Sequence, residues 1–416
     1  MSADGQQAAF IAMDVAGFPS VSELAVVPAT GGEVTIVSAG LDRDCNSPSS
    51  GMTGPIWDSA GQLTVLVEDA GAIHGYRFDS RRPGRGELLL GGQRRVTSLD
   101  ERDGVMAYVL SGPADPPRLV VTSRGGVERT VLAPNSELAA SRDLRAPAHR
   151  KVLGSDGTSI DSWLTLPDGR LWRSPFPLML CLQGGGTQYG YQWSHEFQAL
   201  TAAGFATLQV NPRGSAGYGN AWQRSVSGPH AVRPGTGWGS VDIDDVVAVV
   251  EDTLASSDAL DPVRVGVQGG SYGGLVTAWL LGATDLFAAG WAERGPYDLV
   301  SLAGTNDESP WFFETYLGRN VVEDPAAYWA SSALRLAPGI TAPLAIMHSE
   351  QDRRCPIQQA EELFMALKLL GRTVELIRFP GEGHGLSRTG SPVHRLQRLE
   401  LMIEWFTRWL RPEAAS

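Results

Sequence analysis

Hydrophobic residues follow two different patterns along the 416-residue chain, and the change from one to the other divides the sequence. From about residue 9 to residue 135, short apolar runs alternate with turns rich in glycine, aspartate and serine. Short strands broken by such turns predict an all-β segment. From residue 177 onward, apolar strands alternate with segments that carry apolar residues at helical spacing, which is typical of a parallel sheet covered by helices.

This change predicts three segments: an all-β region over 1–140, a linker over 141–154 and an α/β region over 155–416. Groups of strands in the first region recur roughly every 45 residues, close to the ~40–50-residue period of β-propeller blades. The first region is therefore predicted to be a partial β-propeller of about three blades. A small β-sandwich is the alternative.

The most informative stretch is 263–274, where a β-branched strand, a glycine-rich turn and an apolar helix follow one another. The turn fits Gly-x-Ser-x-Gly, with Ser271 between Gly269 and Gly273. A nucleophile elbow needs this composition, because its serine lies on a sharp strand-to-helix turn in which neighbouring side chains would collide. Ser271 is the predicted nucleophile, and the backbone N–H of Tyr272 is a predicted oxyanion donor. The alternative is a glycine-rich turn without chemistry.

A serine nucleophile needs a general base, and the base needs an orienting carboxylate. The predicted strands 343–348 and 374–379 end in loops that contain Asp352 and His384, which gives the order Ser, Asp, His of α/β-hydrolases. Carboxyl ends of parallel strands gather at one edge of a sheet, so we expect both side chains to meet Ser271. Taken singly, each could instead be an ordinary loop residue.

Two further features complete the predicted site. Backbone N–H groups of the glycines after the strand 178–182 can face the elbow, and Gly185 is the predicted second oxyanion donor. An aromatic cluster between the elbow helix and the acid strand is predicted to line an apolar pocket for a substrate side chain, with helix packing as the alternative. Its members are Trp311, Phe312, Phe313 and Tyr316.

The composition of the chain limits its possible partners and its location. The formal net charge of −12 argues against nucleic acid as a partner and provides no basic patch for a membrane surface. No apolar run reaches the ~18 residues of a membrane span, and the polar N-terminus lacks the pattern of a signal peptide. The three cysteines are far apart and lack metal-ligand spacing, which favours reduced thiols in a cytoplasmic protein without a bound metal.

Several motifs together resemble the prolyl oligopeptidase family of serine peptidases, and most closely its acylaminoacyl-peptidase branch. The resemblance runs from about residue 155 to residue 410 and implies nucleophile Ser271, acid Asp352, base His384 and oxyanion donors Gly185 and Tyr272. It rests on the Asn-Pro-Arg-Gly loop at 211–219, the Trp-Gly-x-x-Asp-x-x-Asp block at 238–245, the elbow at 269–274, and the acid and base loops at 352–356 and 380–384.

The chain departs from the family pattern in two places. The family usually has His-Gly-Gly-Pro where residues 183–186 read Gln-Gly-Gly-Gly, so the loop keeps its two central glycines but loses its proline. The family's propeller, which is implied to gate the site, has many more blades than the about three expected here. Either the chain is the C-terminal portion of a longer protein, or the propeller is open. The strand edges of an open propeller would need to be covered by a partner or by a second copy of the chain, as in a homo-oligomer.

The sequence thus predicts a serine peptidase that hydrolyses short peptides by Ser-His-Asp acyl transfer, acylaminoacyl- or oligopeptidase-like, with no cofactor. Two alternatives stay open. The same triad would serve a carboxylesterase of small esters, and the short propeller would also fit a catalytically silent remnant of a longer peptidase.

Overall fold

The computed structural model describes residues 1–45, 54–123, 126–228, 237–308 and 310–415, and it divides the chain into two compact units. The N-terminal unit comprises residues 1–146, 186–194 and 215–224, and the C-terminal unit comprises 147–185, 195–214 and 225–416. Two short segments from the predicted α/β region therefore belong to the N-terminal unit.

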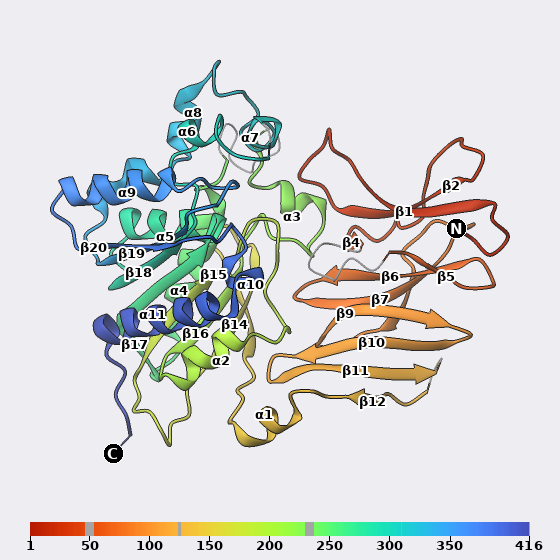
Figure 1. The fold of residues 1–416 in the computed structure, drawn as a ribbon, viewed down its shortest axis with the longest axis horizontal. Helices are drawn as coiled ribbons and strands as arrows, with labels where there is room; N and C mark the ends of the chain where they lie inside the picture. The colour runs from red at the N-terminus through yellow and green to blue at the C-terminus, as the bar shows by residue number, and fades with distance from the viewer. Residues whose placement is uncertain (46–53, 124–125, 229–236, 309, 416) are drawn as a thin grey trace. The chain divides into compact units, whose positions relative to one another are not determined.

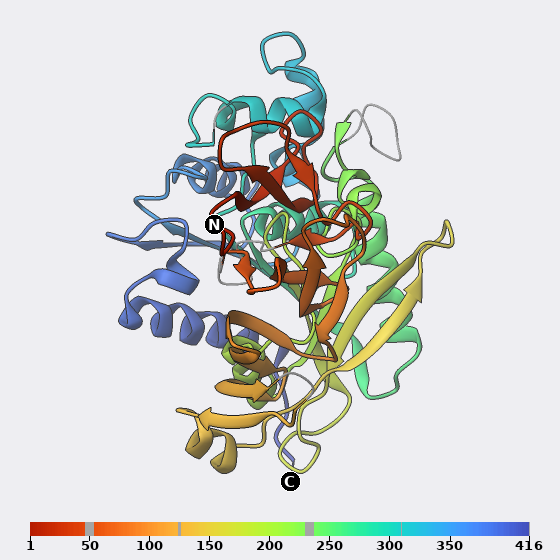
Figure 2. The same ribbon diagram turned by 90° about the vertical axis from the view of Figure 1, so that its right-hand side faces the viewer.

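The N-terminal unit is built from strands in two sheets, in which the neighbours are antiparallel except for the parallel pair of β7 and β9 (Figures 1 and 2). The first sheet has the order β1-β2-β3. The second has the order β12-β11-β10-β9-β7-β6-β4, with β5 paired to β6 and β8 paired to β7. The strands are β1 (Gln7–Met13), β2 (Ser22–Pro28), β3 (Thr35–Ile36), β4 (Asp44–Cys45), β5 (Ile56–Trp57), β6 (Gln62–Asp69), β7 (Ala72–Asp79), β8 (Glu87–Leu90), β9 (Arg95–Arg102), β10 (Val105–Gly112), β11 (Asp115–Ser123) and β12 (Arg129–Leu132), followed by the short helix α1 (Ser136–Ser141).

Strand β6 is buried on both of its faces, because successive side chains of a strand point in opposite directions. Leu63, Val65 and Val67 pack with Leu24 and other residues of the first sheet. Leu66 packs on the other side with a cluster that includes Tyr108 of β10. In a propeller, a blade packs between its neighbours, so its strands carry apolar side chains on both faces. A sheet with one face in water would carry them on one face only.

The two added segments are tied into the N-terminal unit by hydrogen bonds. The Gln188 side chain accepts from the N–H of Gly71 at 2.7 Å and donates to the carbonyl of Ala72 at 3.0 Å. Asp44 is buried and accepts from the N–H of Gly217 and from the side chain of Gln223. Hydrogen-bond partners for polar groups of the strand region therefore come from segments 186–194 and 215–224. The second of these segments contains α3 (Asn220–Arg224).

The C-terminal unit is organised around one eight-stranded sheet of order β13-β14-β16-β15-β17-β18-β19-β20 (Figure 1). β13 to β14 and β14 to β16 are antiparallel pairs, and every pair from β16 to β20 along this order is parallel. The strands are β13 (Ala148–Leu153), β14 (Ser159–Thr165), β15 (Phe176–Leu182), β16 (Ala206–Asn211), β17 (Leu260–Gly270), β18 (Ala289–Glu293), β19 (Leu344–Ser349) and β20 (Val374–Phe379).

Helices cover both faces of this sheet, and adjacent residues of β18 mark the two sides. A Cβ added at Gly290 would lie 2.4 Å from the Leu281 side chain of α5, so this face packs against α5. The next residue, Trp291, packs in a cluster with Phe406 of α11. The helices are α2 (His195–Ala202), α4 (Val241–Ala255), α5 (Tyr272–Ala283), α6 (Leu299–Leu302), α7 (Pro310–Leu317), α8 (Pro325–Ala330), the 3-10 helix η3 (Ala333–Gly339), α9 (Gln358–Leu369), α10 (Leu386–Thr389) and α11 (Pro392–Leu410).

The segment expected from the sequence to be a linker, 141–154, contains β13, which pairs with β14 over its whole length. Its alternation of polar and apolar residues is weak, since only Val152 of the strand is buried. An edge strand that is exposed on most of its surface needs few apolar residues, and this explains why the hydrophobic pattern alone did not predict it.

The Phe406→Ala variant is expected to lower the free energy of unfolding of the C-terminal unit by about 3–5 kcal/mol, because it removes buried apolar surface and leaves a cavity. Phe406 is 0% exposed, whereas Val393 on the same helix is 64% exposed. Val393→Ala is the matched control, and its effect should stay within about 0.5 kcal/mol. Urea unfolding followed by tryptophan fluorescence measures both. Equal midpoints for the two variants would contradict the packing described for α11.

Candidate functional site

The turn between β17 and α5 holds Ser271 in an uncommon backbone conformation. Ser271 is the N-cap of α5 and has φ 62° and ψ −124°. A non-glycine residue at positive φ costs roughly 1–3 kcal/mol, and such strain persists only where the surroundings enforce it. Here the Ser271 N–H donates to the carbonyl of Glu293, at the end of β18, over 3.0 Å. The strand-to-helix turn predicted from the sequence is therefore present, with the serine at its apex.

The two glycines that flank Ser271 are required by close approach of the backbone. A Cβ at Gly269 would lie 2.7 Å from the carbonyl oxygen of Gly273, and a Cβ at Gly273 would lie 2.7 Å from the carbonyl oxygen of Gln183. Real Cβ atoms do not come this close to backbone atoms, so only glycine allows strand and helix to close at this angle.

The structure brings the three predicted residues of the triad together. The Ser271 hydroxyl lies 3.1 Å from Nε2 of His384, and Nδ1 of His384 lies 2.7 Å from Oδ2 of Asp352. Asp352 is only 4% exposed, and its other oxygen accepts the backbone N–H groups of Arg354 and Cys355, each at 2.9 Å. With one oxygen held by the loop, the other is fixed toward the imidazole, which matches the geometry of a nucleophile, base and orienting acid.

Burial keeps the imidazole of His384 in its neutral form. Desolvation lowers the pKa of His384 below its usual 6.5, the negative charge and hydrogen bond of Asp352 partly oppose this change, and the positive charge of Arg294 adds to it. A neutral imidazole whose Nδ1 carries the proton leaves Nε2 free to accept the proton of Ser271. The site can therefore activate a hydroxyl at neutral pH.

The loops that carry the acid and the base are fastened to each other. The Gln351 N–H donates to the carbonyl of Glu382 at 2.9 Å, which joins the loop after β19 to the loop after β20. The Glu382 carboxylate accepts from Nδ1 of His394 at 2.7 Å and from the N–H of Ser391 at 3.0 Å, both at the start of α11. Glu382 was not singled out from the sequence, since a lone glutamate in a glycine-rich loop carries no distinguishing pattern.

The two predicted oxyanion donors lie side by side. A Cβ at Gly185 would make ordinary contact with the Tyr272 Cβ at 3.4 Å, so the glycine loop runs along the elbow. Tyr272 is the first residue of α5, where backbone N–H groups have no partner within the helix. These two backbone groups can therefore be directed at one point near the Ser271 hydroxyl.

The Tyr272 side chain is held away from that point by Asp242. Its hydroxyl donates to the Asp242 carboxylate, which is fully buried and also accepts the N–H groups of Gly239 and Ser240. Burial, with the nearby Asp242, raises the pKa of the Tyr272 phenol well above its usual value, so the phenol keeps its proton. The link of Asp242 to the elbow depends on packing between segments that are distant in the sequence, so no local pattern predicts it.

The predicted aromatic cluster lies beside the elbow and includes one ring that the sequence did not assign to it. The Trp238 ring packs at a tilt against Tyr272, with ring centroids 5.3 Å apart, and against Tyr316, at 4.7 Å. Phe312 and Phe313 also surround Trp238, at 6.1 and 6.2 Å. Trp311 extends the group through Phe312 at 6.2 Å and is 40% exposed. The Trp-Gly block at 238–245 was the signal available for Trp238.

Arg213, in the loop after β16, has structural contacts. Its guanidinium forms a bidentate ion pair with Asp245, with Nε 2.9 Å and Nη2 2.6 Å from the carboxylate oxygens. A third donor, Nη1, reaches Asp156 at 2.6 Å. Arg213 thereby anchors its loop to the start of α4.

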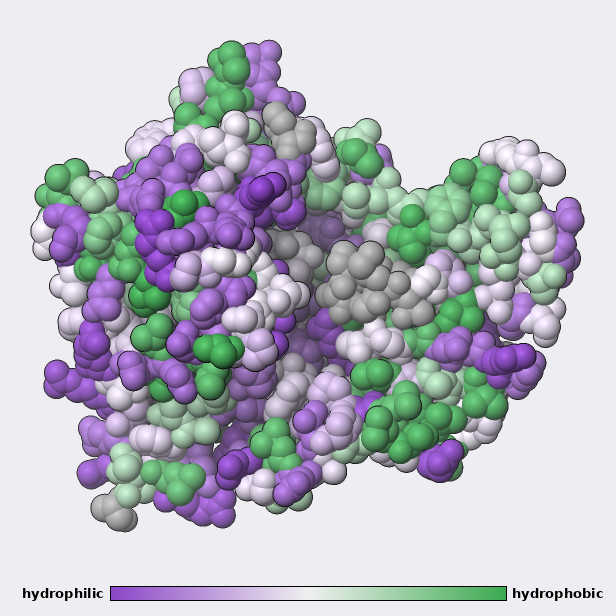
Figure 3. Space-filling model, viewed as in Figure 1, coloured by the Kyte–Doolittle hydropathy of each residue, from purple (hydrophilic) through white to green (hydrophobic). Residues whose placement is uncertain are grey.

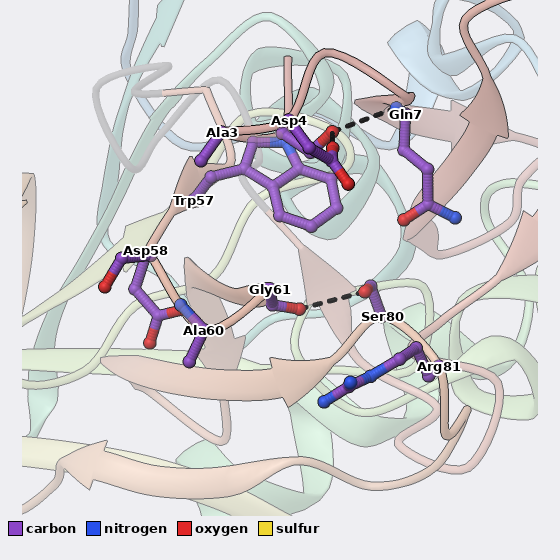
Figure 4. Close-up of a pocket in the computed structure, with 11 residues that line it drawn as sticks. Ala3, Asp4, Gln7, Trp57, Asp58, Ala60, Gly61, Ser80 and Arg81 are labelled. Carbon is purple, nitrogen blue, oxygen red and sulfur yellow. Dashed lines mark hydrogen bonds between the residues drawn. The ribbon is translucent and has the colours of Figure 1, made fainter.

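A separate pocket of about 240 Å³ lies in the N-terminal unit, and none of the triad residues lines it. Figure 4 shows the Trp57 ring between Asp4 and the turn at Gly61, with Ser80 and Arg81 on the side of the neighbouring turn. The pocket contains no arrangement of nucleophile, base and acid, so the chemistry of the chain is centred on Ser271 instead.

Three further properties concern the described part of the chain. Within it, no three or more His, Cys, Asp or Glu side chains are grouped so as to hold a metal ion. Cys45, Cys181 and Cys355 are all buried free thiols. None of the helices described combines the length and the apolar character needed to cross a bilayer.

Comparison with known proteins identifies the family and several relatives of this chain. The prolyl oligopeptidase family matches residues 191–413. The uncharacterized peptidase YuxL of Bacillus subtilis is 36% identical over 299 residues, which cover 72% of this chain and 44% of that protein. Dipeptidyl-peptidase 5 of Porphyromonas gingivalis is 25% identical over 99% of this chain and 58% of its own. This chain thus spans about half the length of these two relatives.

Among solved structures, an uncomplexed acylaminoacyl peptidase of Pyrococcus horikoshii is similar to almost the whole chain. The two share 26% identity with a TM-score of 0.86, and the match covers 99% of this chain and 63% of that one. The predicted fold class, an α/β-hydrolase unit preceded by an all-β partial β-propeller, is thereby confirmed.

The environment of His384 leads to a prediction for its titration. In NMR spectra of protein labelled at the histidine rings, the pKa of His384 should lie below 6.5, and Asp352→Asn should lower it further, because the lost carboxylate stabilises the imidazolium. The His384→Gln variant identifies the resonance. A pKa above 6.5, or a rise in Asp352→Asn, would contradict the burial and pairing described here.

Proposed function

The chain belongs to the prolyl oligopeptidase family, and we propose on that premise that it is a serine peptidase that hydrolyses short peptides. The observation that carries the proposal is the continuous line of hydrogen bonds from Ser271 through His384 to Asp352. The order of these residues along the chain, the strained elbow and the family membership support the same conclusion.

The proposed reaction has two acyl-transfer steps. His384 accepts the Ser271 proton as Oγ attacks the substrate carbonyl, and Asp352 stabilises the imidazolium that forms. His384 then gives this proton to the leaving amine, and the acyl group stays on Ser271 as an ester. In the second step His384 takes a proton from a water molecule as its oxygen attacks the ester, and then returns this proton to Ser271 Oγ as the carboxylic acid product leaves. We propose that these steps need no cofactor.

The backbone N–H groups of Gly185 and Tyr272 are proposed to bind the oxyanion of each tetrahedral intermediate. Both are main-chain donors on segments that contact each other, so they need no reorganisation as the charge develops. The replacement of the family's usual histidine and proline by Gln183 and Gly186 leaves these two donors in place.

The aromatic cluster is proposed to bind an apolar side chain of the substrate. Trp238 and Tyr316 contact each other next to Tyr272, which follows the nucleophile. Phe312 joins them to Trp311, which is 40% exposed. Pockets for substrate side chains are lined mainly by apolar and aromatic groups. Phe313, which is 4% exposed, is proposed to support these rings from behind.

For the mode of cleavage, we propose removal of an acylated N-terminal residue, or cleavage of short oligopeptides by the same site. The likeness to an acylaminoacyl peptidase over nearly the full chain supports the first. A second mode, release of dipeptides from a free N-terminus, is suggested by the name of the Porphyromonas gingivalis relative. The carboxylesterase and silent-remnant alternatives are not favoured, since the triad is intact and the relatives are named as peptidases.

The remaining sequence-based predictions are kept as proposals. These are a cytoplasmic location, no nucleic-acid partner, and a homo-oligomer that covers open strand edges. Figure 3 shows apolar surface over the strands of the N-terminal unit. Strand β12 at the end of its sheet has Val131 48% exposed and Leu132 58% exposed, which supports the last of these.

Digestion of paired short peptides, one N-acetylated and one with a free amine, tests the proposal. We expect release of the acetylated first residue, followed by mass spectrometry, and no release by Ser271→Ala, which lacks the nucleophile. A fluorophosphonate should label the wild-type protein but not this variant.

Other outcomes have defined meanings. Internal cleavage of both peptides would identify an oligopeptidase, and dipeptides from the free-amine peptide alone would identify a dipeptidyl peptidase. Hydrolysis of esters without any peptide cleavage would overturn the proposal in favour of an esterase. Absence of both labelling and hydrolysis would reject a serine hydrolase altogether.

Removal of one oxyanion donor gives a quantitative prediction. Gly185→Pro removes the N–H and should lower kcat by about 10²–10³-fold, the usual effect of losing one such donor. Gly185→Ala keeps the N–H and adds a Cβ at an ordinary 3.4 Å contact, so it is the matched control. Similar kcat values for the two variants, in protein that binds substrate normally, would exclude Gly185 as a donor.

A further inference from the structure

Three buried charged residues and the partly buried Glu196 form a group next to the nucleophile turn. Glu293 is 1% exposed, Arg294 is 6% exposed and Arg398 is 5% exposed. Arg398 donates to Glu293 at 2.6 Å and to Glu196 of α2 at 2.6 Å. The charges of two acids and two bases compensate one another here, yet burying such charges can cost more free energy than an apolar core of the same volume would.

Glu293 connects this group directly to Ser271. Its backbone carbonyl accepts the Ser271 N–H at 3.0 Å. Its carboxylate accepts from three donors, which fix it completely: Nε1 of Trp291 at 2.7 Å, Nη1 of Arg294 at 2.7 Å and Nε of Arg398 at 2.6 Å. The main-chain oxygen that accepts from the strained serine thus belongs to a residue whose carboxylate is held by three hydrogen bonds.

Arg294 lies against the other side of the nucleophile turn. A Cβ at Gly270 would be 2.6 Å from Cζ of Arg294 and 2.7 Å from each terminal nitrogen, so the guanidinium covers the face of Gly270. Arg294 itself has φ 39°, and its N–H donates to the carbonyl of Met347 at 2.9 Å. Its buried Nε has no hydrogen-bond partner among the described residues. A strained, incompletely satisfied arginine at this position is costly for stability, which points to a functional reason for its presence.

We propose that the Glu293–Arg294 ion pair positions the nucleophile: Glu293 holds the Ser271 N–H, and Arg294 fills the space behind Gly270 and places a fixed positive charge near the base. Arg294 is a positioning residue, and the inference rests on the proposed serine-hydrolase function. The pair would keep the hydroxyl aligned with His384 while the backbone stays strained.

The charge of Arg294 gives this role a distinctive signature. The groups that act on His384 are Asp352 of the acid loop, which favours its protonation, and Arg294 and Arg388, which oppose it. His348, buried next to Asp352, is also coupled to His384. Arg398 is not among the largest influences on the pKa of His384. Loss of the Arg294 charge should therefore make His384 easier to protonate, whereas loss of Arg398 should not.

The test compares Arg294→Met, Arg294→Lys and Arg398→Met by the pH dependence of kcat/KM and of Ser271 labelling by a fluorophosphonate. Arg294→Met should lower kcat by on the order of 10- to 100-fold with little change in KM, as expected for a misplaced reacting atom. It should also move the acid limb to higher pH. Arg294→Lys should keep the acid limb near its wild-type position and lose kcat, because an ammonium does not replace the planar guanidinium.

Arg398→Met is the matched control. It removes the other arginine that is paired with the Glu293 carboxylate and leaves Arg294 against Gly270. It should lower thermal stability but leave the acid limb in place. Equal shifts in Arg294→Met and Arg398→Met, or a wild-type kcat and acid limb in Arg294→Met, would overturn the proposal.

Two safeguards keep the outcomes distinguishable. If Arg294→Met does not fold, Gly270→Ala serves instead, since its Cβ would displace the guanidinium while the charge remains; a wild-type kcat in that variant would overturn the positioning role. Wild-type protein that is neither labelled nor active would reject the proposed function itself, whereas an active wild type with unaffected variants would reject only the role of Arg294.

Discussion

The hydrogen bond from the Ser271 N–H to the Glu293 carbonyl is the interaction on which the site depends. It joins the tip of β17 to the end of the neighbouring strand β18 and holds a serine at φ 62°. Without it, the backbone would relax toward an ordinary conformation and the hydroxyl would turn away from the base. The glycines at 269 and 273 follow from this constraint, because the turn closes so tightly that backbone atoms occupy the places of their side chains.

The parallel sheet supplies the rest of the alignment. β17, β18, β19 and β20 are consecutive neighbours, so the ends of three of them deliver Ser271, Asp352 and His384 to one edge. Strand spacing sets the separation, and short hydrogen bonds such as the one from Gln351 to Glu382 set the final orientation. The same edge receives Gly185 from the end of β15, on the other side of β17. A single topological feature therefore positions four of the five residues proposed for chemistry, and Tyr272 follows Ser271 directly.

The sequence predicted those parts that depend on local pattern and chain order. The elbow has a steric requirement that only glycine meets, and the acid and base each follow an apolar strand, so residue order alone was enough to name Ser271, Asp352 and His384. Other features depend on contacts between distant segments. The role of Trp238 beside the elbow, the carboxylate of Asp242 on the Tyr272 hydroxyl and the guanidinium against Gly270 leave no periodic signal. Strand β13 was missed because an exposed edge strand needs no apolar face.

The interleaving of the two units has a consequence for how the chain can be divided. The N-terminal unit includes residues 186–194 and 215–224, and Asp44 in its strand region depends on Gly217 and Gln223 for two of its hydrogen bonds. During synthesis this unit cannot be completed until residue 224 has left the ribosome. By then the residues of β13 to β16, which belong to the other unit, have already been synthesised. A cut near residue 146 would leave a buried carboxylate without those donors. The boundary between the units is therefore not a single point in the sequence, and exchanging the strand region between relatives would require all three of its segments to be moved together.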